Sequence, residues 1–150
     1  MRRPEEALVV VHRPADEPEF LVLERSPERQ GYWHLVAGAL DEGEDAATAA
    51  RRELREETGL DAAVADLERI YRYALDDEPP EVRARFAPDV TEIAVHGFAA
   101  AAPPGWEPEL DEEHVGYRWC TEDEALRLLR YPEPRDAVEL VARNLVEAGA

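Results

Sequence analysis

Short apolar runs separated by polar, turn-forming segments organise the first part of the chain. Two runs rich in valine and leucine, ALVVVH (7–12) and EFLVLER (19–25), flank the segment RPADEP, whose composition is typical of a turn. The pair therefore predicts a β-hairpin. A third apolar run, YWHLVAG (32–38), predicts a strand that leads into a glycine turn.

The pattern changes to helical spacing after the loop DEGED. Asp45 stands where an N-cap is favoured and Gly59 where a C-cap is favoured, so we expect a helix that ends at about Thr58. One face of this helix is expected to carry the glutamates of RRELREETGL (51–60). The opposite face consists of small and apolar residues: Ala46, Ala47, Ala49, Ala50 and Leu54.

Two long apolar segments and one short one predict further strands in the second half of the chain. The first of them has a mixed alternation that a helix would also fit, and we interpret it as a strand. A Pro-rich loop, DDEPPEVRARFAPD, joins the two long segments, and a second loop, AAPPGWEPELDEEH, precedes the short one. The predicted strands are VADLERIYRYAL (64–75), VTEIAVHGFAAAA (90–102) and VGYRWC (115–120).

Two helices are expected at the end of the chain. TEDEALRLLR begins with Thr121 and Glu124 in capping-box spacing. YPEP breaks this helix, and RDAVELVARNLVEAG then places Val138, Val141 and Leu145 on one stripe of an amphipathic helix. The order of elements predicts an α/β fold, with a mixed sheet packed against helices. Because no repeat or linker divides the sequence, residues 1–150 are expected to form a single domain.

The chain is strongly acidic. Its 150 residues include 35 Asp or Glu and 17 Lys or Arg, which gives a formal net charge of −18. This balance argues against binding a nucleic acid polymer or an anionic membrane through basic patches. It still permits a small phosphorylated ligand if divalent cations lie between the ligand and the protein.

Targeting segments and cysteine chemistry add little to the prediction of function. The N-terminal apolar run ALVVV is too short for a signal peptide or a membrane span, so a cytoplasmic protein is expected. Cys120 is the single cysteine and leaves no disulfide within the chain. We expect it to be a half-buried thiol beside Trp119 rather than a nucleophile.

The spacing of Glu53, Glu56 and Glu57 is the strongest chemical signal. Positions i, i+3 and i+4 bring three carboxylates to one helix face. Hard oxygen ligands at this density suit Mg²⁺ or Mn²⁺, and no adjacent His or Cys favours zinc. Arg52 is placed to hold a carboxylate in a forked pair. The alternative is an ordinary solvated face with Arg–Glu pairs.

The full stretch GALDEGEDAATAARRELREETGL (38–60) resembles the Nudix signature, G-x5-E-x7-R-E-U-x-E-E-x-G-U, in which U is a bulky aliphatic residue. All nine specified positions agree. The resemblance implies an α/β/α sandwich in which a mixed sheet lies between helices. It also implies hydrolysis of a diphosphate linked to another group, with Mg²⁺ or Mn²⁺ as the cofactor.

The same resemblance assigns roles to residues. Glu53 is implied as a metal ligand or as the base, Arg52 as the group that orients a glutamate, and Glu44 as a weaker, outer contributor. Because Gly38 has no Cβ, its backbone can approach the metal closely. The implied metal ligands of the signature are Gly38, Glu53, Glu56 and Glu57.

Two segments outside the signature, VRARFAPDVTE (82–92) and EEHVGYRW (112–119), resemble the bacterial dihydroneopterin triphosphate pyrophosphatase branch of the family. That branch also lacks the usual proline–glycine pair before the signature, which is VAG (36–38) in this chain. The resemblance makes Glu113 an extra metal ligand or a general base, with an acidic surface loop as the alternative. His114 is interpreted as a structural or rim residue rather than a base.

The same branch offers substrate contacts. Arg83 and Arg85 are candidates to grip a triphosphate tail, although ordinary surface arginines would look the same. Trp33, Tyr71 and Phe86 are candidates to stack on a pterin or a nucleobase, and core packing is the alternative for each.

The leading hypothesis is a Mg²⁺-dependent pyrophosphohydrolase that acts on a nucleoside or pterin triphosphate, a small-molecule phosphoanhydride. The alternatives within the enzyme class are a broad nucleoside triphosphate pyrophosphatase, an ADP-ribose hydrolase and a dinucleoside polyphosphate hydrolase. A non-catalytic Nudix-fold nucleotide sensor is the alternative from another class. The complete set of signature glutamates argues against the sensor.

Overall fold

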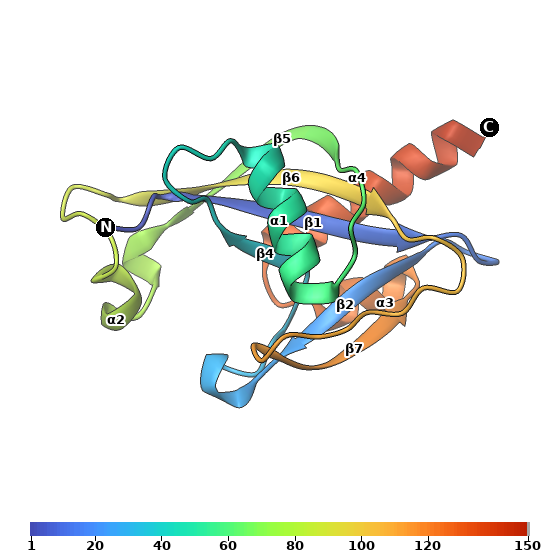
Figure 1. Ribbon diagram of the computed structural model, residues 1–150, viewed down its shortest axis with the longest axis horizontal. Helices are drawn as coiled ribbons and strands as arrows, with labels where there is room; N and C mark the ends of the chain where they lie inside the picture. The colour runs from blue at the N-terminus through green and yellow to red at the C-terminus, as the bar shows by residue number, and fades with distance from the viewer. Residues whose placement is uncertain (150) are drawn as a thin grey trace.

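The computed structural model describes residues 1–149, and in them one seven-stranded mixed sheet lies between two layers of helices (Figure 1). The strands are β1 (Glu5–Arg13), β2 (Glu19–Arg25), β3 (Trp33–His34), β4 (Val36–Ala39), β5 (Ala65–Ala74), β6 (Glu92–Ala101) and β7 (His114–Cys120). The helices are α1 (Ala46–Thr58), α2 (Pro80–Arg83), α3 (Glu122–Leu128) and α4 (Pro132–Gly149), with 3-10 turns at Pro27–Arg29 and Leu75–Asp77.

Strand β1 is the centre of the sheet. It pairs in parallel with β6 and antiparallel with β2 and β4, and the main path of the sheet is β3-β2-β1-β6-β5. Its first half pairs with β4 and its last residues pair with β2, so β4 joins the sheet beside the N-terminal half of β1. Strand β7 pairs with β2.

The alternation of β1 builds both halves of the core. Ala7, Val9 and Val11 pack in the cluster that includes the buried residues of α1. Leu8 and Val10 point to the other face, where they pack with residues of α3 and α4. Figure 1 shows α1 in front of the sheet and α4 behind it. The predicted α/β/α sandwich is therefore confirmed.

Most of the predicted elements are confirmed, including the hairpin of β1 and β2. The caps of α1 form as expected: the Asp45 side chain accepts a hydrogen bond from the Thr48 amide at 2.8 Å, and Gly59 has φ 81°. The capping box of α3 also forms. On α4, Val138 and Val141 are buried in the core cluster, and Leu145 packs against it.

Three predicted boundaries are wrong. The strand expected at 32–38 is divided, because Trp33–His34 pairs with β2 whereas Val36–Ala39 pairs with β1. The Pro-rich loop contains the short helix α2. Helix α4 begins at Pro132, within the expected break, because proline's fixed φ and missing N–H are tolerated in the first helical turn.

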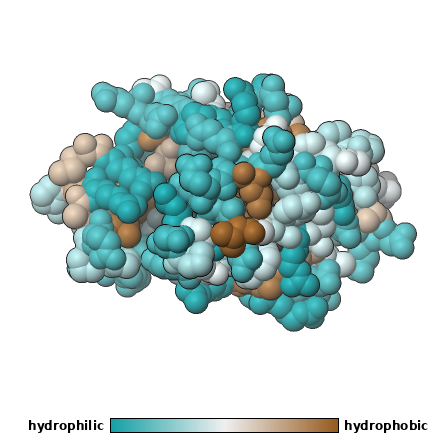
Figure 2. Space-filling model, turned by 60° about the horizontal axis from the view of Figure 1, so that its bottom comes forward, coloured by the Kyte–Doolittle hydropathy of each residue, from teal (hydrophilic) through white to brown (hydrophobic). Residues whose placement is uncertain are grey.

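The surface reflects the acidic composition. Figure 2 shows a face that is mostly hydrophilic, with hydrophobic residues in small groups. Cys120 is fully buried rather than half-buried as expected. Within residues 1–149, no helix combines the length and the apolar character needed to cross a bilayer.

Candidate active site

Helix α1 positions the candidate site because one of its faces is fixed to the sheet. Ala49, Ala50 and Leu54 are fully buried against it. The side chains of Glu53 and Glu57, on the adjoining face of the helix, consequently lie beside β4 rather than in bulk solvent. The fold therefore places two of the three candidate carboxylates beside the glycine of the signature.

Gly38 lies directly against the Glu53 carboxylate. A Cβ at residue 38 would be 2.3 Å from Cδ and from one carboxylate oxygen of Glu53, which is far inside van der Waals contact. Glycine is therefore the only residue that allows β4 and this carboxylate to approach as they do. This contact gives the expected close approach of Gly38 a specific partner.

Glu57 is almost completely buried, with 2% of its surface exposed. Its Oε1 accepts a hydrogen bond from the Ala37 amide at 3.4 Å, and its Oε2 is buried and receives no hydrogen bond from the residues that the structure describes. The pKa of Glu57 is raised well above its usual range, mainly by burial and next by the neighbouring Glu53 carboxyl. Burial also raises the pKa of Glu53. The alternative of an ordinary solvated helix face is therefore wrong for Glu57.

Arg52 connects the remaining acidic residues of the signature. Its guanidinium donates two hydrogen bonds to Glu44, both at 2.9 Å, one to Glu53 at 2.9 Å and one to the Ala39 carbonyl at 3.0 Å. A longer bond of 3.3 Å reaches Glu56, whose side chain is 56% exposed. Arg52 thus orients Glu53 directly and fixes the loop before α1 through Glu44.

The carboxyl groups of α1 fit a hard divalent cation in two respects. The buried Oε2 of Glu57 has no hydrogen-bond donor in the described part of the chain. The pKa values of Glu53 and Glu57 are both raised, so that a cation between the two carboxyls would hold both ionised. Among residues 1–149, no three His, Cys, Asp or Glu side chains already form a complete ligand group. Glu56 can contribute only after it turns away from Arg52.

His114 contacts this group from the side of β7. It is buried, its Nδ1 lies 2.7 Å from Asp111 Oδ1, and its Nε2 lies 3.8 Å from Glu57 Oε1. Of the two interpretations of His114 from the sequence, a structural residue or a rim residue, the structure supports the first. The i, i+3 spacing of Asp111 and His114 in DEEH was the only sequence signal of this contact.

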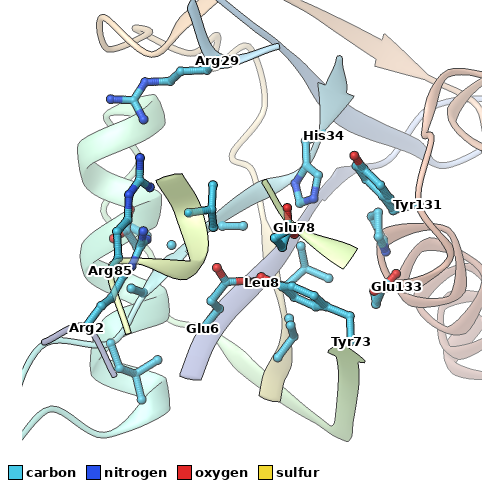
Figure 3. Close-up of a pocket in the computed structure, with 18 of the residues that line it drawn as sticks. Arg2, Glu6, Leu8, Arg29, His34, Tyr73, Glu78, Arg85, Tyr131 and Glu133 are labelled. Carbon is cyan, nitrogen blue, oxygen red and sulfur yellow. Dashed lines mark hydrogen bonds between the residues drawn. The ribbon is translucent and has the colours of Figure 1, made fainter. Parts of the chain in front are cut away.

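A cavity of about 1600 Å³ opens beside the carboxylates, and Gly38, Glu53 and Glu113 line it. The Glu113 carboxylate forms an ion pair with Arg29 at 3.2 Å. Figure 3 shows Arg29 and Arg85 on the side of the cavity that carries α1. Arg85 and Glu113, the candidates from the 82–92 and 112–119 segments that line the cavity, thus lie where a bound substrate would reach them.

Other candidate substrate contacts lie elsewhere. In the described part of the chain, neither Arg83 nor Trp33 lines the cavity. Trp33 packs against the core and Phe86 is buried in it. The hydroxyl of Tyr71 donates a hydrogen bond to Asp136 at 2.6 Å. For these aromatic residues the structure supports the core-packing alternative.

Acid unfolding tests the Arg52–Glu44 pair. The guanidinium lowers the pKa of Glu44 to about 2, so this carboxylate's contribution to stability is complete above pH 4.5 and is lost as the pH falls towards 2. We expect Glu44→Gln to lower the free energy of unfolding by about 2 kcal/mol at pH 7, and this difference to shrink as the pH falls from 5 to 2. Urea unfolding across this range measures it. The exposed Glu17→Gln serves as the control, and a difference that is independent of pH would contradict the assignment.

Comparisons with known proteins agree with this geometry. Residues 2–141 match the NUDIX domain family. The dihydroneopterin triphosphate diphosphatase of Escherichia coli is 30% identical over 148 residues, which cover 95% of both chains. The solved structure of the E. coli dihydroneopterin triphosphate pyrophosphohydrolase superposes with a TM-score of 0.80 at 29% identity and covers 95% of this chain and 97% of that one.

A protein of Myxococcus xanthus named octanoyltransferase is 35% identical over 134 residues. These residues are 89% of this chain but only 35% of that protein's length, so its name describes a molecule of which this chain matches about a third. The family match and the full-length likeness to the E. coli protein carry the assignment. The chain belongs to the Nudix family and is a hydrolase of that family, a pyrophosphohydrolase.

Proposed function

We propose that this enzyme hydrolyses a phosphoanhydride bond of a nucleoside or pterin triphosphate and that it uses Mg²⁺, with Mn²⁺ as a substitute. The observation that carries the proposal is a pair of adjacent carboxyls, one of which lines the cavity. Glu53 lines the cavity, and Glu57 beside it keeps a buried oxygen to which no group within residues 1–149 donates a hydrogen bond. An unsatisfied buried carboxylate oxygen is unfavourable unless a cation or another ligand binds it.

Each residue has a role in this reaction. Glu53 and Glu57, with Glu56 after it leaves Arg52, would hold the ion, and the backbone at Gly38 allows Glu53 to take its position. When bound, the ion would supply charge neutralisation at the diphosphate and a water of lowered pKa. Arg52 keeps Glu53 oriented. The single domain and these roles remain part of the proposal.

Glu113 is the proposed proton acceptor or an extra ligand. It lies in the loop before β7 and lines the cavity, and its ion pair with Arg29 would have to open for either role. In the reaction, the water oxygen forms a bond to phosphorus while an anhydride P–O bond breaks. The products are a monophosphate and pyrophosphate, and the proton of the water passes to a carboxylate and then to solvent.

Two observations support a triphosphate as the substrate. The E. coli relative, which aligns over 95% of both chains, is named for dihydroneopterin triphosphate. The cavity has arginines for an anionic tail, among them Arg85, and its volume of about 1600 Å³ accommodates a ring, a linker and three phosphates.

Metal removal provides the first test. We expect no turnover of a panel of nucleoside and pterin triphosphates in EDTA, and turnover to monophosphate and pyrophosphate when Mg²⁺ is added in excess. Chromatographic separation of the products and a pyrophosphate assay measure this. A nucleotide that raises the melting temperature without being hydrolysed would contradict the proposal and would favour the sensor.

A further inference from the structure

The floor of the cavity contains an acidic residue at a position where strand alternation would predict an apolar one. Glu6, Leu8 and Val10 occupy alternate positions along β1, so the side chain of Glu6 is on the same face of the sheet as those of Leu8 and Val10, which face the core. The Tyr73 hydroxyl donates a hydrogen bond to Glu6 Oε1 at 3.1 Å. Figure 3 shows Glu6, Leu8 and Tyr73 close together, with Arg2 on one side of them and Glu133 on the other.

Glu6 forms no salt bridge within residues 1–149, although Arg2 and Arg25 lie near enough for their charges to offset part of the rise in the pKa of its carboxyl. Its only hydrogen bond within residues 1–149 comes from a neutral phenol, and burial raises the pKa of its carboxyl. A carboxyl in this position loses solvation without gaining an ion pair, which is unfavourable for folding alone. It therefore retains acceptor capacity directed at the cavity, because Tyr73 occupies only one of its oxygens.

Two further acceptors, His34 and Glu133, line the end of the cavity at Tyr131 (Figure 3). Glu133 has a buried Oε2 without a hydrogen-bond partner in the described chain. His34 Nδ1 lies 3.0 Å from the Leu35 carbonyl, to which only a protonated nitrogen can donate. Burial lowers the pKa of His34 to about 4, so the ring is neutral at pH 7 and its Nε2 is an acceptor. This end of the cavity thus presents acceptors to a ligand that supplies donors.

The opposite end has the complementary character. Figure 3 shows Arg2, Arg29 and Arg85 towards α1, whereas Tyr131 and Glu133 lie towards α4. The rings of Tyr131 and Tyr32, whose centroids are 5.2 Å apart, form an aromatic wall at the acceptor end. The cavity therefore fits a molecule with an anionic tail and a flat ring whose edge carries N–H donors.

We propose that Glu6 selects substrates whose ring presents adjacent N–H and amino donors, the 2-amino-4-oxopyrimidine edge that guanine and pterins share. A carboxylate accepts both donors of this edge in a forked pair, as it accepts the two donors of a guanidinium. Adenine presents an acceptor at the corresponding ring nitrogen and is discriminated against. This inference rests on the proposed function for the tail and extends it to the ring.

GTP and ATP test this inference because they differ only in the ring edge and amino position. We expect wild-type protein with Mg²⁺ to prefer GTP in kcat/KM. Glu6→Gln should lower kcat/KM for GTP by about 10- to 100-fold, mainly through KM, and change that for ATP by less than about threefold. Glu81→Gln is the matched control, since Glu81 lines the same cavity but is exposed at its rim. An unchanged GTP preference in Glu6→Gln would overturn the inference and leave the proposed function intact.

A binding measurement separates the two proposals. Guanosine and adenosine lack phosphates, so calorimetry with these nucleosides in EDTA reports the ring site alone. Guanosine binding that Glu6→Gln abolishes would support the inference even if no triphosphate were hydrolysed, which would refute only the proposed function. If Glu6→Gln does not fold, Tyr73→Phe releases Glu6 from its orienting hydroxyl and should reduce the GTP preference by raising KM for GTP. An unaltered KM in that variant would count against the inference.

Discussion

Glu57→Gln is expected to lower kcat/KM by at least about 10³-fold, because the lost ligand removes several kcal/mol of charge stabilisation at the reacting phosphate. The substitution keeps the shape of the side chain and its contact with the Ala37 amide. With its oxygen directed at the Ala37 amide, the glutamine places its NH₂ group where the glutamate has Oε2, and this nitrogen cannot bind a cation. Steady-state kinetics with Mg²⁺ measure the loss of activity. Calorimetric titration with Mn²⁺ measures the loss of ion binding.

The same substitution is expected to stabilise the fold. Burial and Glu53 raise the pKa of Glu57, so the folded state binds more protons than the unfolded state between pH 4.5 and the raised pKa. Its contribution to stability is present below pH 4.5 and is lost as the pH rises through the raised pKa. At pH 7 we expect the melting temperature of metal-free Glu57→Gln to exceed that of wild type by roughly 2–4 °C, the shift for about 1 kcal/mol.

Glu147→Gln, on the exposed side of α4, is the control for both measurements. It changes the net charge equally and should alter neither activity nor melting temperature. Near-normal turnover in Glu57→Gln would remove Glu57 from the site. A lower melting temperature would mean that the buried carboxyl stabilises the fold through a contact that the structure does not contain.

Local sequence patterns predicted helix α1 and its signature well because their determinants lie within one segment. Asp45 and Gly59 cap the helix through neighbouring backbone groups, and the i, i+3, i+4 spacing fixes which side chains share a face. The burial of Glu57 was not predictable in this way. It depends on β4 and His114, which reach α1 only through the tertiary fold.

The cavity could be predicted even less, because its walls come from distant parts of the chain. Glu6 and Tyr73 are 67 positions apart and meet only when β1 and β5 both pair with β6. Arg83 and Arg85 looked equivalent in the sequence. The unpredicted helix α2 includes Arg83 as its last residue, and of the two arginines only Arg85, two residues beyond the helix, lines the cavity. An acidic residue at an inward position of β1 was the one local signal available.

Gly38→Ala is expected to lower kcat/KM by about 10²-fold while changing stability little, since a displacement of about 1 Å at a reacting group has an effect of this size. The added Cβ would lie 2.3 Å from the Glu53 carboxylate, so Glu53 must swing aside and leave the position in which Arg52 holds it. Because the group that moves is the end of a flexible side chain, we expect the melting temperature to fall by no more than it does in Gly97→Ala. Gly97 is the matched control, a strand glycine whose added Cβ would make only ordinary contacts at 3.5 Å or more.

A double-mutant cycle with Glu53→Ala identifies the cause of the loss. If Gly38→Ala acts by displacing the Glu53 carboxylate, it should have almost no further effect on kcat/KM when that carboxylate is already absent, and the two substitutions should be strongly non-additive. Additive losses would instead mean that the alanine disturbs β4 itself. In that case the conformation of the strand, rather than the space left for one carboxylate, would explain why the signature requires a glycine at this position.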